Sequence, residues 1–180
     1  MSDRIPMLVL GLGNLLCADD GVGVVALHRL RDDWHLPDGV VAVDGGTLGL
    51  ALLPLVERAE RVILIDAVRA DGPPGTPVRL TGDDVAPAVR DRLSPHQVGV
   101  ADLLGGAALL DRYPTEVVIV GVVPASVDLA FERTPAVAAA LPALVARVVA
   151  ELAAHGFAPV ARGPTRAERS RDDAARALGL

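Results

Sequence analysis

Residues 5–31 read IPMLVLGLGNLLCADDGVGVVALHRLR, and this stretch decides the fold. It begins with an apolar run, Ile5–Leu10, of the kind that forms a strand buried on both faces. Asp19 and Asp20 follow, and carboxylates suit the positive N-terminal end of a helix. The next residues, 21–31, place their larger apolar side chains on one side of a helix. A buried strand followed by an amphipathic helix is the start of an α/β fold.

Strands and helices continue to alternate along the chain. Further strands are predicted at 40–43, 61–65, 77–80 and 116–123, and further helices at 48–58, 99–112 and 134–155. The segment at 77–80 reads as an edge or antiparallel strand, and Pro142 is expected to kink the last helix. The alternation predicts one α/β domain, with a mostly parallel twisted sheet of about five strands flanked by helices on both faces.

Length and composition fit this fold. A chain of 180 residues is long enough for one domain with a full core, and 51% of it is hydrophobic. Residues 1–160 are expected to form the domain, and 161–180 a charged, flexible C-terminal tail. No apolar run approaches 18 residues and no cleavage site follows the first strand, so we expect neither a membrane span nor a signal peptide.

Several classes of function are disfavoured by composition. The single cysteine, Cys17, excludes an internal disulfide and a multi-cysteine zinc site, and it fits a reducing cytoplasm. The net charge of −6 argues against a nucleic-acid partner. The chain contains no lysine, which excludes Schiff-base chemistry, and it has no motif typical of serine or zinc peptidases.

The segment Gly11-Leu12-Gly13-Asn14 raises the alternative of nucleotide binding. A dinucleotide-binding fingerprint needs a third glycine where Leu16 stands, and no Gly-Lys-Ser/Thr phosphate loop follows. We therefore interpret these glycines as residues that allow a tight backbone turn.

Three polar residues follow strands or precede helices at positions where α/β sheets bind ligands. Asp20 comes after the first strand, Asp66 ends the third, and His96 lies in a loop before a later helix. Two carboxylates and an imidazole together suit a borderline divalent metal such as nickel. Each residue also has a simpler explanation: Asp20 as a helix cap or first-turn carboxylate, Asp66 as an acceptor of turn hydrogen bonds, and His96 as an ordinary loop histidine. Asp44, before two glycines, could accept turn hydrogen bonds as well.

Five segments, in this order and spacing, resemble the hydrogenase maturation protease family. They are GLGNLLCADDGVG (11–23), DGGTLG (44–49), LIDAV (64–68), SPHQVGVADLL (94–104) and VGVVP (120–124). The resemblance extends from about residue 7 to about residue 156. It implies an endopeptidase that removes a C-terminal extension from the large subunit of a nickel–iron hydrogenase after nickel insertion.

The resemblance also implies roles for individual residues. Asp20, Asp66 and His96 match positions that contact nickel in the family, and this nickel belongs to the substrate. The segment Asp44–Thr47 matches one implicated near the cleavage site, with Gly45, Gly46 and Thr47 expected to bind substrate. Some family members carry Glu where Asp20 stands. Asp20 or Asp44 would serve as general base in an aspartic-type mechanism, and the sequence leaves that choice open.

The expected partner is the nickel-loaded large-subunit precursor, with no organic cofactor, no membrane and no nucleic acid. We expect a monomer in the cytoplasm. Two alternatives to this function stay open at this point: a related peptidase acting on a different protein, and a non-catalytic nickel-sensing adaptor. The hydrogenase isoenzyme, the cleaved sequence and the affinity for free metal are not encoded in any visible motif.

Overall fold

Five strands form the central sheet of the computed structural model, which describes residues 4–90 and 98–163. The strands are β1 (Ile5–Leu12), β3 (Val40–Gly46), β4 (Ala59–Ala67), β5 (Pro77–Thr81) and β6 (Glu116–Val122). Their order across the sheet is β3-β1-β4-β6-β5. Only β5 pairs antiparallel, at one edge, so the predicted mostly parallel sheet is confirmed. A separate pair joins β2 (Trp34–His35) to β7 (Val160–Ala161).

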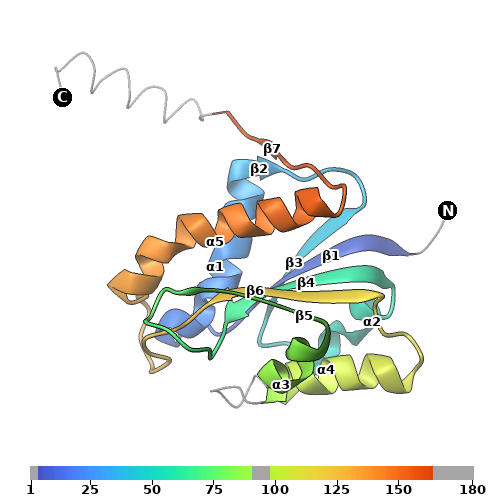
Figure 1. The fold of residues 1–180 in the computed structure, drawn as a ribbon, viewed down its shortest axis with the longest axis horizontal. Coiled ribbons are helices and arrows are strands. Elements are labelled where there is room, and N and C mark those ends of the chain that lie inside the picture. Colours follow the sequence, from blue (N-terminus) through green and yellow to red (C-terminus); the bar gives the residue numbers. More distant parts are fainter. Residues whose placement is uncertain (1–3, 91–97, 164–180) are drawn as a thin grey trace.

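Helices cover both faces of the sheet, as predicted (Figure 1). They are α1 (Val22–Asp33), α2 (Leu53–Val56), α3 (Val85–Arg90), α4 (Val98–Leu109) and α5 (Pro135–Ala154), with the 3₁₀ turns η1 (Ala18–Gly21), η2 (Gly49–Leu52) and η3 (Gly82–Asp84). Helices α1 and α5 lie on one face, whereas α2, α3 and α4 lie on the other.

The two faces of the sheet carry two hydrophobic cores, because successive strand residues point in opposite directions. Along β1, Leu8 and Leu10 pack toward α2 and α4, whereas Met7 and Val9 pack toward α1 and α5. The same alternation holds along β4 and β6. Continuous apolar runs in the sequence are therefore explained by burial on both faces.

Two predicted boundaries are wrong. Strand β3 continues through Asp44 to Gly46, where a break was expected, because Asp44 still pairs with Gly11 of β1. The stretch 48–58 is not one helix, because η2 is followed by the short α2. Pro54 lies in the first turn of α2, the position where its missing N–H removes no helical hydrogen bond.

The expectation of no membrane span stays a prediction. Among the described residues, helix α5 is the one helix long and apolar enough to cross a membrane by length and composition alone. Its buried residues, including Val137, Leu144 and Leu152, pack against the sheet. The helix continues through Pro142. This arrangement is that of a core helix in a soluble α/β domain.

The last described residues are held against the end of α1. The Arg162 backbone N–H donates to the Asp33 carbonyl at 2.7 Å, and the Arg162 Nε donates to the Trp34 carbonyl at 3.1 Å. Residues 164–180 lie outside the described part of the chain. The predicted division into a domain and a tail at residue 160 stays a prediction.

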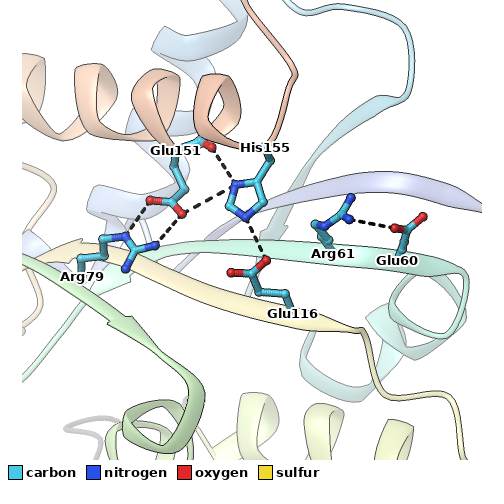
Figure 2. A network of polar contacts seen from close by, with 6 residues as sticks. All are labelled: Glu60, Arg61, Arg79, Glu116, Glu151 and His155. Atoms are coloured by element: carbon cyan, nitrogen blue, oxygen red, sulfur yellow. Dashed lines mark hydrogen bonds and ion pairs between the residues drawn. The ribbon is translucent and has the colours of Figure 1, made fainter.

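A polar network joins the C-terminal end of α5 to the sheet (Figure 2). Arg79 of β5 donates two hydrogen bonds to the Glu151 carboxylate, at 2.7 and 2.8 Å. His155 lies between the Glu151 carbonyl, 2.8 Å from its Nδ1, and the Glu116 carboxylate, 2.9 Å from its Nε2. The His155 side chain is only 15% exposed.

This network predicts a pH-dependent stability. The hydrogen bond that His155 donates to the Glu151 carbonyl raises the pKa of His155 above its ordinary value; burial opposes this rise, and the contact with the Glu116 carboxylate adds to it. A raised folded-state pKa means that the contribution of His155 is fully present below the unfolded pKa. It is lost as the pH rises through the folded pKa. We expect His155→Gln to destabilise the protein more at pH 6 than at pH 9, measured by urea unfolding (on the order of 1 kcal/mol per unit of pKa shift).

The control for this prediction is His35→Gln, which replaces an exposed histidine on β2. Equal pH slopes for the two variants would contradict the assignment to His155.

Candidate active site

The direction of chain progression reverses beside β1. Helix α1 leads from β1 to β3 on one side, and α2 leads back to β4 on the other side. Open α/β sheets bind ligands at such a switch point, beyond the carboxyl ends of the strands. Asp20 lies in η1, shortly after β1, and Asp66 is the second-last residue of β4. Because η1 packs against β4, the structure places two of the predicted site residues at this switch point.

The loop after β1 folds closely around the Asp20 carboxylate, which is 0% exposed. Its Oδ2 accepts a hydrogen bond from the Asn14 backbone N–H at 2.7 Å. Gly13 has a φ of +116°, and a Cβ at that position would lie 1.8 Å from the Asp20 carbonyl oxygen. Glycine is therefore required here, which agrees with the interpretation of the glycine segment as a tight turn.

Asp66 is also buried, at 1% exposure. Its Oδ1 accepts a hydrogen bond from the next backbone N–H, that of Ala67, at 2.8 Å. The start of α1 lies directly against this strand end, since a Cβ on Gly23 would lie 2.0 Å from the Ile65 carbonyl oxygen. Close packing of α1 on β4 thus brings the segment that carries Asp20 to the strand that carries Asp66.

Of the two simpler explanations of Asp20, the first-turn carboxylate is confirmed, because Asp20 lies in the first turn of η1, whereas the helix cap is wrong. The N-cap residues of η1 and α1 are Cys17 and Gly21, and neither helix start has a side-chain cap hydrogen bond. For Asp66, the bond from the Ala67 N–H fits the expected local role as an acceptor of turn hydrogen bonds.

The neighbouring carboxylate, Asp19, has a structural role. It is buried and accepts hydrogen bonds from the backbone N–H groups of Ala125, Ser126 and Thr134 and from the Thr134 hydroxyl, at 2.7–3.2 Å. These partners lie in the loop between β6 and α5, and Thr134 is the N-cap residue of α5. Asp19 therefore ties the site loop to the start of the last helix.

A pocket of about 230 Å³ opens beside this loop. It is lined by the end of β3 and the loop after β1, including Asp44, Gly46, Thr47, Gly13, Asn14 and Leu15. The Asp44 side chain is 39% exposed, and its Oδ2 lies 2.9 Å from the Nε2 of His28 on α1. Gly45 is buried, and Thr47 follows the strand as an exposed residue. The structure thus gathers the Asp44–Thr47 segment and the first loop around one pocket.

The third predicted metal contact, His96, lies outside the described residues. Within residues 4–90 and 98–163 no group of three His, Cys, Asp or Glu side chains is close enough to hold a metal ion. Of the three predicted metal contacts, the described residues therefore include Asp20 and Asp66. Their carboxylate oxygens can bind metals such as nickel together with an imidazole.

Two contributors to this region were missed by sequence reasoning. His28 of α1 is 49% exposed, and its Nε2 pairs with the Asp44 carboxylate of β3. Asn14 supplies the N–H that holds Asp20, and its Oδ1 accepts the Leu16 N–H at 3.0 Å. No sequence pattern marks the pair of His28 and Asp44, because the two residues belong to separate elements and lie 16 residues apart.

Comparison with known proteins identifies the family. A family model described as hydrogenase maturation protease matches residues 24–151. The hydrogenase expression/formation protein HupD of Rhodobacter capsulatus is 40% identical over 162 residues, which cover 88% of this chain and 76% of that protein. The hydrogenase 2 maturation protease of Escherichia coli (strain K12) is 34% identical over 157 residues, with coverages of 87% and 96%.

The fold agrees with this relationship. The solved structure of the hydrogenase maturating endopeptidase HybD from Escherichia coli superposes with a TM-score of 0.83 at 34% identity. The superposition covers 87% of this chain and 98% of that one. Sequence and fold therefore agree over most of the described residues, and the chain belongs to the hydrogenase maturation protease family and is a peptidase.

Proposed function

We propose that this peptidase removes a C-terminal extension from the large-subunit precursor of a nickel–iron hydrogenase after nickel has been inserted. The observation that carries the proposal is the position of Asp20 and Asp66. In a chain of this family, both carboxylates lie at the switch point between β1 and β4. The names of the relatives support the same class of substrate.

In this proposal the nickel belongs to the precursor, and Asp20, Asp66 and His96 complete its coordination. Carboxylate oxygen and imidazole nitrogen are suitable donors for nickel beside the thiolates of the substrate. Asp20 and Asp66 are almost completely buried, which keeps both carboxylates away from solvent in the free enzyme.

The two candidate general bases differ in exposure, which supports a division of roles. Asp20 is buried and bonded to Asn14, as suits a metal contact. Asp44 lines the pocket, is partly exposed, and has His28 beside it to orient the carboxylate. We propose that Asp44 accepts the proton of the attacking water, while the substrate's nickel polarises the scissile carbonyl.

The end of β3 is the proposed binding site for the extended precursor segment. Strand β3 lies at the edge of the sheet, and an extended peptide can add to such an edge through backbone hydrogen bonds. Gly46 and Thr47 line the pocket, and Gly45 lies between Asp44 and Gly46. The small residues leave room for a peptide backbone close to Asp44.

A cleavage assay tests the proposal. The purified protein is mixed with nickel-loaded and with nickel-free precursor from the same organism, and the products are weighed by mass spectrometry. We expect loss of a C-terminal peptide from the loaded form alone. Cleavage of both forms would support the peptidase activity but show that nickel is not the signal for cleavage. Binding without cleavage of the matched isoenzyme would favour the adaptor function instead. We place this reaction in the cytoplasm and assign it to a monomer.

A further inference from the structure

Two loops at the carboxyl end of the sheet lie side by side. They are the loop after β1, residues 13–17, and the loop between β6 and α5, residues 123–134. The Ala18 N–H donates to the Ala130 carbonyl at 2.7 Å, and the Ala130 N–H donates to the Leu16 carbonyl at 2.9 Å. Cys17 and Ala130 form a parallel β-bridge. The two loops therefore form one backbone-bonded surface.

This surface exposes four large apolar side chains, which we call the apolar platform: Leu15, Leu16, Leu129 and Phe131. Their exposures lie between 43% and 84%. Phe131 is one of only four aromatic residues in the chain, and it is 80% exposed. Exposed apolar side chains on two joined loops, with exposed carboxylates next to them in sequence, here Asp128 and Glu132, are typical of a protein interface.

The platform stands on a well-ordered base. Asp19 bonds the loop between β6 and α5 at Ala125, Ser126 and Thr134, and the Asp19 N–H donates to the Ser126 carbonyl at 3.1 Å. A partner that binds here would meet a surface whose backbone is already arranged. Less conformational entropy would then be lost on binding.

The platform is continuous with the candidate active site. Leu15 lines the pocket that contains Asp44, and the adjacent Asn14 holds the Asp20 carboxylate. A protein whose extended segment reaches that pocket must therefore lay its folded part against the neighbouring loops. This continuity identifies the occupant as the substrate protein rather than an unrelated partner.

We infer that the apolar platform binds the folded body of the hydrogenase large-subunit precursor, separately from the contacts to its C-terminal extension and its nickel. The inference rests on the proposed function. It goes further by dividing recognition into two parts: the platform supplies affinity, and the carboxylates supply the response to nickel. Apolar and aromatic side chains at the centre of an interface commonly carry most of the binding energy.

The test measures binding and cleavage separately with the full chain. Nickel-free precursor, which is not expected to be cut, is titrated against the wild type, against Leu129→Ser with Phe131→Ser, and against Leu129→Ser alone. We expect the double variant to bind at least about tenfold more weakly, with an intermediate value for the single variant. With nickel-loaded precursor, the double variant should show a raised KM and an unchanged kcat.

The matched control is Leu109→Ser, which removes an equally exposed leucine (87%) at the end of α4. The chain from Leu109 leads into the start of β6, at the opposite end of the sheet from the site. The control should bind and cleave like the wild type.

Unchanged binding by a folded double variant would overturn the inference that the platform binds the precursor, while leaving the proposed function in place. A wild type that self-associates through the platform, with the double variant monomeric, would overturn it as well. If the wild type neither binds nor cleaves the matched precursor, the proposed function fails and the platform inference fails with it.

Discussion

Asp20→Asn and Asp66→Asn are each expected to lower the cleavage of nickel-loaded precursor by more than about 100-fold, since even residues that only support metal ligands cost 10–100-fold when changed. Asparagine keeps the shape of aspartate. Its carbonyl oxygen can still accept the hydrogen bond from Asn14 or from Ala67. The substitution therefore removes the charge that the proposed metal contact requires while leaving the local backbone bonds.

The measurement is kcat/KM from the mass-spectrometric assay, with the urea-unfolding midpoint as a check of the fold. Asp38→Asn serves as control, because Asp38 is exposed and precedes β3 at the other end of the sheet. If both variants cleave at the wild-type rate, the metal-contact role of Asp20 and Asp66 is refuted. Loss of activity together with loss of folding would place both residues among the structural carboxylates.

Asp19→Ala is expected to destabilise the fold by roughly 3–5 kcal/mol, because hydrogen bonds to a charged group contribute about 1.5–3 kcal/mol each and partly buried N–H groups are left without this partner. The affected N–H groups belong to Ala125, Ser126 and Thr134. A loss of this size is a large fraction of the 5–15 kcal/mol typical of a domain. Asp19→Asn should fall between the wild type and Asp19→Ala, because an amide retains one oxygen acceptor.

The stability change is measured by urea unfolding at neutral pH, provided that the transition is two-state. The control is Asp128→Ala in the same loop, whose exposed carboxylate accepts a bond from the Ser126 hydroxyl. We expect that change to cost less than about 1 kcal/mol. If both variants lose a similar free energy of unfolding, the hydrogen bonds to the Asp19 carboxylate are not what holds this loop in place.

Much of the fold follows from local pattern. The apolar runs predicted β1, β4 and β6, and the edge strand β5 was expected at 77–80. Errors occurred where local signals conflict. Strand β3 extends through its glycines, because Gly46 still pairs with Leu12 of β1, and the stretch 48–58 forms η2 and the short α2 rather than one helix.

The candidate site was predictable only in part. Asp20 and Asp66 were chosen because they follow strands, and the strand order then places them at the same switch point. Asp19, which has a structural role, directly precedes the candidate site residue Asp20 in the sequence. Its role became visible only through Thr134, 115 residues away. His28 gave no signal because its partner Asp44 lies on a different element.

The sequence by itself determined the α/β class, the parallel sheet, the family resemblance and the pair of carboxylates at the strand ends. These properties depend on residue type and on short-range periodicity, which are written directly in the chain. Only the tertiary structure decided which loops meet: the Asp19 bonds to the start of α5, the Asp44–His28 pair, and the apolar platform of Leu15, Leu16, Leu129 and Phe131. Such contacts join segments far apart in sequence, and they form only when the order and packing of the strands bring those segments together.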